Sequence, residues 1–311
     1  MAIECPIYLT ADNTQQWIDA FARQYPHIKV LDWQHASRPA DVRYAIVWQP
    51  CGEFFQRFPN LEAVFNLGAG VDGILCHPQL PREVQVIRLE NAGMAAQMNQ
   101  YFAYHIMHFH RSMDTYQRQQ SQQHWQSHPG TPAGDFRVGI LGLGQLGSSV
   151  ADCLFKLGYK VSGWSQSEKY IEGVQCFQGA DQLNDFLQQT DALCCLLPLT
   201  DNTRDLLNRH TMGQLPAGAV IINAARGEHL VEDDLLELLD SGHLRGAVLD
   251  TVRNEPLAAD SSLWRQAGLI ITPHCAAQSW IEPTVKQIGN NIDTLLAGKT
   301  PTGLVERNRG Y

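Results

Sequence analysis

Apolar residues in this chain gather in short runs separated by longer amphipathic segments. Five runs in the first hundred residues are rich in β-branched and aromatic side chains, which predicts strands: 6–9, 28–33, 44–48, 63–67 and 84–89. Between the first two runs, TQQWIDAFARQY (14–25) has the spacing of apolar positions that is typical of a helix. Such alternation of strands and helices predicts an α/β lobe with a doubly wound parallel sheet.

A second series of runs begins near residue 136. Its predicted strands are nearly continuous in apolar residues, as in a sheet covered on both faces: 136–141, 160–164, 192–197, 219–225, 246–250 and 269–272. A helix is expected at 231–242 and another at about 283–297. We expect the last helix to pack back on the first lobe, which makes that lobe discontinuous and leaves a cleft between the two.

Between the two series lies a long predicted helix, from about Gln97 to Gln123, that is rich in Gln and His. It would suit a connector or a contact between subunits. Its histidines include His105, His108 and His110, but only the first two share a helical face and no acid or cysteine lies close to them. No metal site is therefore expected.

Composition excludes several classes of partner. The 311 residues carry 18% charged side chains and a formal charge of −9, which argues against nucleic acid and anionic membranes. No run approaches the length of a membrane span, and MAIECPIYLT at the N-terminus does not resemble a signal peptide. The eight cysteines are scattered, without a CxxC pair, and are expected to be free thiols. We therefore expect a cytoplasmic protein.

A glycine pattern joins the strand at 136–141 to a helix expected to begin near Gln145. The G-x-G-x-x-G spacing permits a tight turn, close approach of a pyrophosphate to the backbone, and close packing of helix on strand. In this βαβ context it predicts a Rossmann domain that binds a dinucleotide. The residues expected to contact the dinucleotide here are Gly142, Gly144, Gln145, Leu146 and Gly147.

The second strand of this unit lacks the acidic residue that usually binds the ribose of NAD. GWSQSEK (163–169) offers Ser165 and Ser167 as donors and Lys169 as a cation, which suits a 2′-phosphate. We therefore expect NADPH to be preferred, with NADH possible. The alternative is that SQSEK is only a polar turn, because it lacks an arginine to bind phosphate in a bidentate way.

Three polar residues follow late strands of the second lobe: Arg226, Glu255 and His274. Reduction of a 2-oxo acid needs a cation for the carboxylate and carbonyl, a proton donor, and an anion that favours the charged form of the donor. Arginine, histidine and glutamate supply these in turn. Taken singly, each has a structural alternative: a loop cap, a turn residue before proline, or a buried histidine.

Taken together with LGLGQLG, LLPLTDNTRDLLN, the segment from MGQLPAG to VRNEPL, and ITPHCAA, these residues closely resemble the D-2-hydroxyacid dehydrogenase family. The resemblance covers nearly the whole chain. It implies that Arg226 binds the substrate, that His274 is the acid/base, and that Glu255 is its partner. It also implies a discontinuous, flavodoxin-like substrate domain at 1–98 plus 284–311 and a Rossmann dinucleotide-binding domain at 99–283.

The same resemblance implies further contacts. Asp250 would contact the nicotinamide carboxamide, with the backbone around Leu197, Pro198 and Ala225 lining the cofactor. In LGAGVDG, backbone N–H groups of Ala69, Gly70 and Val71 would bind the substrate carboxylate, although a glycine turn is the alternative. A homodimer built on the cofactor lobe is implied, with the helix at 97–123 as the contact.

Within the family the pattern is similar to bacterial glyoxylate/hydroxypyruvate reductases that use NADPH, through VWQP, FNLGAGVDGIL, AGMAAQMNQY, GWSQS and the ending RGY. Those reductases tend to place Arg where Gln166 stands, and many other relatives carry Glu where Gln97 stands. Trp48 and Met94 would wall a pocket for short 2-oxo acids, although such residues are more often core. Other readings are a D-lactate or 3-phosphoglycerate dehydrogenase, and a nucleotide-sensing corepressor.

Overall fold

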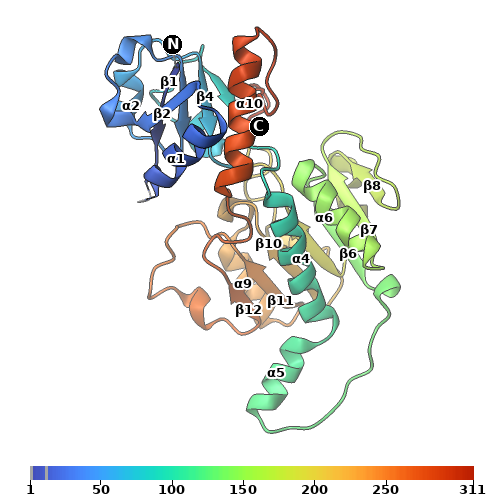
Figure 1. The fold of residues 1–311 in the computed structure, drawn as a ribbon. Coiled ribbons are helices and arrows are strands. Elements are labelled where there is room, and N and C mark those ends of the chain that lie inside the picture. The colour runs from blue at the N-terminus through green and yellow to red at the C-terminus, as the bar shows by residue number, and fades with distance from the viewer. Residues whose placement is uncertain (1–2, 11–12) are drawn as a thin grey trace. The chain divides into compact units, whose positions relative to one another are not determined.

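The computed structural model describes residues 3–10 and 13–311. The chain divides into two compact units. Unit 1 comprises Met1–Met94 and Ser279–Tyr311, and unit 2 comprises Ala95–Gln278 (Figure 1). The first two residues of MAIECPIYLT, where no signal peptide was expected, lie outside the described residues.

Unit 1 is built on a parallel sheet with the order β2-β1-β3-β4-β5. Its strands are β1 (Ile3–Tyr8), β2 (Ile28–Asp32), β3 (Tyr44–Val47), β4 (Ala63–Asn66) and β5 (Gln85–Ile87). All four pairings are parallel. The order 2-1-3-4-5 is that of flavodoxin-like sheets, so the predicted fold class of this lobe is confirmed.

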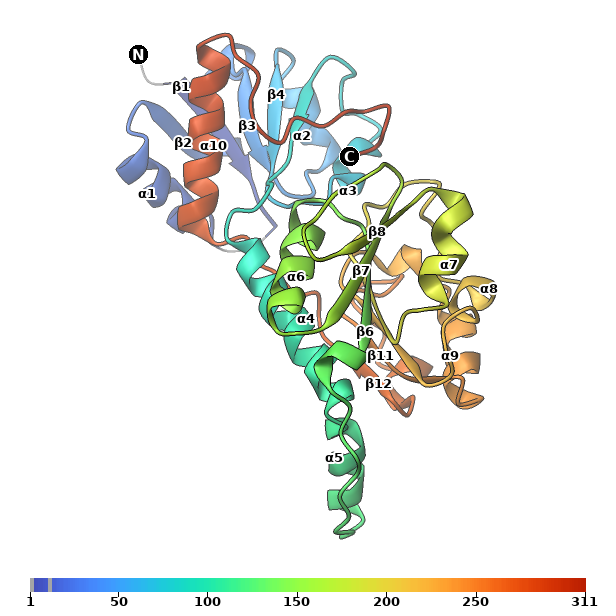
Figure 2. The same ribbon diagram turned by 90° about the vertical axis from the view of Figure 1, so that its right-hand side faces the viewer.

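The described part of unit 1 also contains the helices α1 (Thr14–Gln24), α2 (Gly52–Arg57), α3 (Asp72–Leu75) and α10 (Ile281–Leu296). The last helix of the chain lies against the first, α10 beside α1 (Figures 1 and 2). The Tyr25 hydroxyl bonds Asn290 at 2.8 Å, and a Cβ at Gly289 would overlap the Tyr25 ring. A glycine on α10 thus allows residues from both ends of the chain to share one core.

Unit 2 contains a seven-stranded parallel sheet with the order β12-β11-β10-β9-β6-β7-β8. The strands are β6 (Arg137–Leu141), β7 (Lys160–Ser165), β8 (Gln175–Gln178), β9 (Ala192–Cys195), β10 (Ala219–Asn223), β11 (Leu244–Leu249) and β12 (Leu269–Ile271). Counted within the unit, the order is 7-6-5-4-1-2-3, which is the Rossmann arrangement with one added strand. This confirms the predicted cofactor-domain fold.

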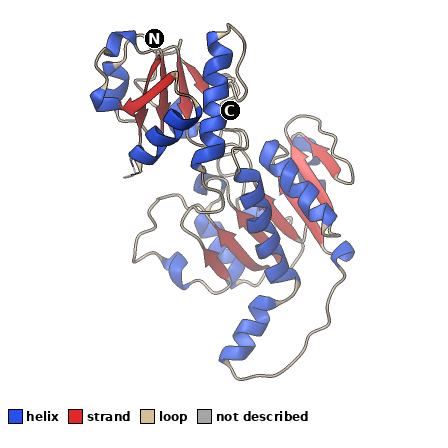
Figure 3. Cartoon of the chain, in the orientation of Figure 1, coloured by secondary structure: helices blue, strands red, loops and turns tan. Residues whose placement is uncertain are grey.

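Helices cover both faces of this sheet (Figure 3). They are α4 (Met94–His110), α5 (Met113–Ser121), α6 (Gln145–Lys156), α7 (Leu183–Leu187), α8 (Arg209–Met212) and α9 (Glu232–Asp240). Apolar residues of α4 and α6 share one core with Cys194, and those of α7, α8 and α9 share the other with Cys195. Adjacent strand residues point to opposite faces, which explains why β9 is apolar throughout.

The predicted strands of unit 2 omit β8, which the structure adds at the edge of the sheet. Its four residues, QCFQ, are exposed at the ends and half-buried in the middle. An edge strand needs little apolar sequence, because part of its surface stays in solvent. Its sequence therefore resembles that of a polar connection.

The single helix expected at 97–123 is wrong. Ser112 takes a left-handed conformation with φ +56°, which separates α4 from α5. The buried Phe109 ring holds the end of α4 against Gly246, and the Arg245 guanidinium holds the start of α5 through Asp114 at 2.9 Å. The α5 helix and the segment after it extend away from the sheet of unit 2 (Figures 1 and 2), and Trp125 in this segment is fully exposed.

Other expectations concern chemistry away from the site. All eight cysteines are free thiols, as predicted. Across residues 3–10 and 13–311, no helix is long and apolar enough to cross a membrane. The same residues contain no group of three or more His, Cys, Asp or Glu suited to a metal ion. His105 and His108 lie buried on α4 instead, with the His105 ring centroid 4.4 Å from that of Tyr101.

Candidate active site

Loops that follow three neighbouring strands carry the predicted catalytic residues. Arg226 follows β10, Glu255 follows β11 and His274 follows β12. These strands are adjacent and parallel, so their carboxyl ends lie at one edge of the sheet. That edge is where open α/β sheets bind ligands.

His274 and Glu255 form a direct pair. The Nδ1 atom of His274 lies 2.9 Å from Oε2 of Glu255, whose Oε1 accepts a hydrogen bond from the Val252 N–H at 3.2 Å. A carboxylate can only accept, so Nδ1 carries the proton and Nε2 is left to exchange one with a ligand. Both side chains remain about two-fifths exposed, so a substrate could reach the ring.

Asp250 fixes the loop that carries His274. Its buried carboxylate accepts hydrogen bonds from the Thr272 hydroxyl at 2.6 Å and from the N–H groups of Cys275 and Ala276 at 2.8 and 2.9 Å. Its carbonyl accepts from the His274 N–H at 2.8 Å. These bonds over-determine a backbone in which His274 has φ +51°, a conformation that non-glycine residues rarely adopt.

A tyrosine extends this network into the protein. The Tyr101 hydroxyl lies 2.7 Å from the Thr272 oxygen, and Thr272 gives its only proton to Asp250, so Tyr101 is the donor. Burial raises the pKa of Tyr101, which keeps its hydroxyl protonated. Because the Asp250 oxygens are engaged by the protein itself, the carboxylate has a structural role beyond the nicotinamide contact predicted for it.

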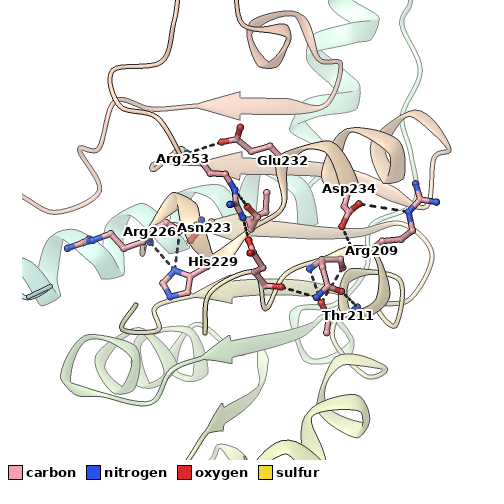
Figure 4. Close-up of polar contacts among 11 residues, drawn as sticks. Arg209, Thr211, Asn223, Arg226, His229, Glu232, Asp234 and Arg253 are labelled. Atoms are coloured by element: carbon pink, nitrogen blue, oxygen red, sulfur yellow. Dashed lines mark hydrogen bonds and ion pairs between the residues drawn. The ribbon is translucent and has the colours of Figure 1, made fainter. Parts of the chain in front are cut away.

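Arg226 is brought to the site by a close approach of two backbones. A Cβ at Gly227 would overlap the carbonyl group of Val252, so only glycine lets the end of β10 lie against the loop that carries Glu255. The half-buried Arg226 side chain donates from Nη1 to the Ala225 carbonyl at 2.8 Å. Its backbone is held by Asn223 and His229 (Figure 4).

The glycine loop has the geometry that a dinucleotide requires. Gly142 has φ +100°, and a Cβ at Gly147 would overlap the Gly142 carbonyl, so the turn and the packing of α6 both need glycine. Gly144 has φ −77°, and a Cβ there would meet no protein atom within 4 Å. No side chain caps α6, whose first N–H groups are therefore suited to an anion.

In the turn after β7, Ser165 does not have the free hydroxyl donor that was expected of it. Ser165 is buried, and its hydroxyl donates to the Ser167 carbonyl at 2.6 Å. That proton is already used within the turn, so Ser165 shapes the loop rather than offering a free donor. Gln166, Ser167 and Lys169 are exposed.

The remaining predicted cofactor residues follow β9 and β10, at the carboxyl ends of these strands. Leu197 and Ala225 are buried, and Pro198 is half-buried. The Pro198 carbonyl accepts from the Thr203 hydroxyl at 2.7 Å, and the Asn223 side chain accepts from the Ala225 N–H at 3.2 Å. These contacts hold both backbone segments in defined positions.

In unit 1, the loop after β4 carries the predicted carboxylate site. The Asn66 amide donates to the Gly68 and Gly70 carbonyls at 3.2 and 2.9 Å. Within residues 3–10 and 13–311, the N–H groups of Ala69, Gly70 and Val71 donate no hydrogen bond. Trp48 is half-buried against Gly68, where a Cβ would lie 2.6 Å from its ring, and Met94 is 4% exposed.

Sequence reasoning noted Gln97 without giving it a contact, and it missed His229. Gln97 donates to the Gln278 carbonyl at 2.8 Å and accepts from its N–H at 3.1 Å, a pairing that glutamate cannot make because it has no donor. His229 is fully buried beside Arg226. A histidine three residues after an arginine carries no sequence signal that the two are in contact. The presence of Gln97 where many relatives have Glu can be read from the sequence.

The chain is similar to known proteins in both sequence and structure. Residues 103–276 match the model of the D-isomer specific 2-hydroxyacid dehydrogenase, NAD binding domain. Glyoxylate/hydroxypyruvate reductase A of Serratia proteamaculans is 43% identical over 305 residues, covering 96% of this chain and 97% of the relative.

Two solved structures are similar over the full chain. A D-isomer specific 2-hydroxyacid dehydrogenase from Xanthobacter autotrophicus in complex with NADPH and MES has a TM-score of 0.95 at 37% identity, covering 100% of this chain and 99% of its own. An NADPH-dependent glyoxylate/hydroxypyruvate reductase from Sinorhizobium meliloti, in complex with NADP and sulfate, has a TM-score of 0.91 at 33% identity with the same coverage. The chain belongs to the D-isomer specific 2-hydroxyacid dehydrogenase family.

Proposed function

We propose that this protein is an NADPH-preferring reductase of glyoxylate or hydroxypyruvate, giving glycolate or glycerate. The observation that carries the proposal is the His274–Glu255 pair at the strand edge that also presents Arg226. The names of the similar proteins from Serratia and Sinorhizobium support the choice of substrate. NADH remains a second cofactor to be tested.

The cofactor site that we propose fits the residues present. Gly142, Gly144 and Gly147, with the N–H groups of Gln145 and Leu146, would hold the pyrophosphate. Ser167 and Lys169, on the turn shaped by Ser165, would bind a 2′-phosphate, and Leu197, Pro198, Ala225 and Asp250 would line the nicotinamide end. When bound, NADPH supplies a hydride to C2 of the substrate.

The chain's own residues would do the rest of the chemistry. Arg226 would bind the carboxylate and polarise the 2-oxo group with its planar donor fork. His274 would give the Nε2 proton to the carbonyl oxygen as it becomes an alkoxide. Glu255 would hold the ring by Nδ1 and stabilise its positive charge.

We also propose that the N–H groups of Ala69, Gly70 and Val71 bind the substrate carboxylate. Their lack of acceptors within the described part of the chain supports this role. Trp48 and the buried Met94 would form walls of the substrate pocket.

The direct test is steady-state kinetics of the wild type, His274→Ala and Arg226→Ala. The matrix combines NADPH or NADH with glyoxylate, hydroxypyruvate or pyruvate. We expect each variant to lower kcat/KM at least about a thousandfold, because each removes a group that acts on the reacting carbonyl. The exposed residues His35 and Arg38, changed to Ala, are matched controls.

Near-normal turnover by His274→Ala or Arg226→Ala would contradict the assignment. A preference for pyruvate would favour the D-lactate type, and activity with the 2-oxo form of 3-phosphoglycerate would favour that dehydrogenase. Tight NADPH binding without turnover of any 2-oxo acid would favour a nucleotide-sensing protein.

We further propose a cytoplasmic homodimer. The α4 and α5 helices and the following segment expose large apolar side chains that would suit a second copy of the chain: Tyr104, Met107, Met113 and Trp125. The eight free thiols suit a reducing compartment. Size-exclusion chromatography with light scattering tests the dimer, and a monomer at micromolar concentration would contradict it.

A further inference from the structure

His229 lies beside the backbone of Arg226, in the short 3₁₀ turn Gly227–His229 (Figure 4). Its side chain is fully buried. Nδ1 lies 3.2 Å from the Arg226 nitrogen and 3.1 Å from the Arg226 carbonyl oxygen. On the other side of the ring, Nε2 lies 3.3 Å from the Pro198 carbonyl oxygen. One ring therefore touches the segments after β9 and β10.

The partners of His229 define its tautomer. The Pro198 carbonyl can only accept, so Nε2 carries the proton, and Nδ1 accepts from the Arg226 N–H. The Arg226 carbonyl has its own donor, the Asn223 amide at 2.8 Å. Burial lowers the pKa of His229 and outweighs the opposing effect of its hydrogen bonds to the Pro198 and Arg226 backbone, which favours the neutral ring. A neutral ring with Nε2 protonated satisfies the contacts to the Pro198 carbonyl and the Arg226 N–H. In this tautomer the Arg226 carbonyl and Nδ1 are both acceptors, so they form no hydrogen bond with each other.

These contacts fix the direction in which Arg226 leaves the backbone. Asn223 holds its carbonyl and His229 holds its N–H, so the peptide groups on both sides of its Cα are anchored. Through Nε2, the same ring joins Arg226 to Pro198, whose carbonyl Thr203 also holds. The ring therefore links the two segments directly.

We propose that His229 is a positioning residue, which sets Arg226 for the substrate carboxylate through Nδ1 and holds the Pro198 segment for the cofactor through Nε2. This inference rests on the proposed function, because it assigns substrate binding to Arg226 and cofactor lining to Pro198. His229 touches neither ligand in this scheme. Its effect is on the placement of two groups that do.

The two ring nitrogens can be tested separately by substitution. In His229→Asn the side-chain oxygen can take the place of Nδ1, and in His229→Gln the side-chain nitrogen can take the place of Nε2. His229→Leu removes both functions. The readouts are KM and kcat for glyoxylate, the Kd of NADPH from its fluorescence without substrate, and the urea midpoint.

We expect opposite profiles from the two amides. His229→Gln should raise KM about tenfold while the Kd of NADPH stays within about twofold, and His229→Asn should raise the Kd severalfold with little change in KM. His229→Leu should show both losses. His108→Leu, which changes another buried histidine of the unit, should show neither.

Equal profiles for the two amides, with losses that follow the urea midpoint, would overturn the proposal and leave His229 as a packing residue. The comparison of His229→Asn with His229→Gln still tests the proposal if His229→Leu does not fold. The Arg226→Gln variant distinguishes failure of the proposed function from failure of the role proposed for His229. If it leaves KM unchanged, the proposed function fails, and if it raises KM while the His229 variants do not, only the role of His229 fails.

Discussion

The loop after β12 and the turn after β7 lie at the same edge of one sheet but are built differently. The loop with His274 is held by a buried carboxylate that accepts three hydrogen bonds. In the turn after β7, one internal bond joins Ser165 to Ser167, and the side chains that follow Ser165 are exposed. The loop with His274 is held by the protein's own hydrogen bonds. The turn after β7 instead presents its side chains to solvent.

The difference suits the two roles proposed for these segments. Proton transfer depends on geometry within fractions of an ångström, which requires a preorganised loop. Recognition of a 2′-phosphate depends mainly on local charge, which exposed side chains can supply without a rigid frame. We therefore expect substitutions at the fixed strand ends to cost turnover and stability together, and substitutions after β7 to change only which cofactor is used.

The largest effect is expected from Gly227→Ala. A Cβ at this position overlaps the Val252 carbonyl, so it must push Arg226 away from the loop that carries Glu255. We expect kcat/KM to fall at least about a hundredfold and the free energy of unfolding to fall by about 3 kcal/mol, measured by kinetics and urea denaturation.

Gly144→Ala is the matched control for Gly227→Ala. Its Cβ meets no protein atom within 4 Å, so the free energy of unfolding should change by less than about 0.5 kcal/mol. The Kd of NADPH should nevertheless rise about tenfold, because the added methyl group occupies the space proposed for the pyrophosphate. Full stability and turnover in Gly227→Ala would contradict the preorganisation described above.

Asp250→Asn should have the next largest effect. The amide nitrogen would face a donor at one of the two oxygen positions, so at least one buried bond to Thr272, Cys275 or Ala276 is lost. We expect the free energy of unfolding to fall by about 2 kcal/mol and kcat to fall more than tenfold as the His274 loop relaxes. The exposed Asp260→Asn should change neither quantity.

A smaller effect, on selectivity alone, is expected after β7. Gln166→Arg adds a bidentate donor and should raise the ratio of kcat/KM with NADPH to that with NADH about tenfold. Ser167→Asp should lower the same ratio by repelling the phosphate, without a change in the urea midpoint. Asn184→Arg, on the exposed surface of α7, controls for net charge. If the ratio of kcat/KM with NADPH to that with NADH is unchanged in both Gln166→Arg and Ser167→Asp, the turn does not select the cofactor.

The smallest effect is expected at His105, away from the strand edge. Burial lowers its pKa to about 4; the positive charge of His108 acts in the same direction, and Asp250 opposes both. In the unfolded chain the pKa is about 6.5, so the unfolded state binds the proton first and stability is lost as the pH falls from about 6.5 towards 4. His105→Phe should remove up to about 2 kcal/mol of this loss between pH 7.5 and 5, measured by urea denaturation.

The exposed His35→Gln should leave the pH dependence of the wild type unchanged. An identical pH dependence in His105→Phe would show that other groups cause the loss. Since His105 lies against Tyr101, kinetics at pH 7.5 would also show whether the tyrosine needs this neighbour.

Much of this organisation could be predicted from the sequence. The apolar runs of β6, β9, β10 and β11 and the glycines before α6 reflect local physics: burial on two faces, and backbone conformations that only glycine adopts. Arg226, Glu255 and His274 were located because a parallel sheet brings the ends of its strands to one edge. The His274–Glu255 pair was expected from their opposite charges and from the family resemblance.

What the sequence could not provide depends on long-range partners. The break at Ser112 requires Phe109 to be held by Gly246 and Asp114 by Arg245, far away along the chain. The bond that consumes the Ser165 proton depends on the curvature of its own turn. His229 is identified only once the backbones of Arg226 and Pro198 lie on either side of its ring.

The position of α10 in unit 1 has a consequence for synthesis of the chain on the ribosome. Unit 2 is complete at Gln278, before the segment that finishes unit 1 has been translated. At about 5–20 residues per second, residues 1–94 wait for about ten to forty seconds while unit 2 is made. During that interval the surface that later meets Val285, Ile288 and Ile292 has no cover, so newborn chains should depend on chaperones until α10 emerges.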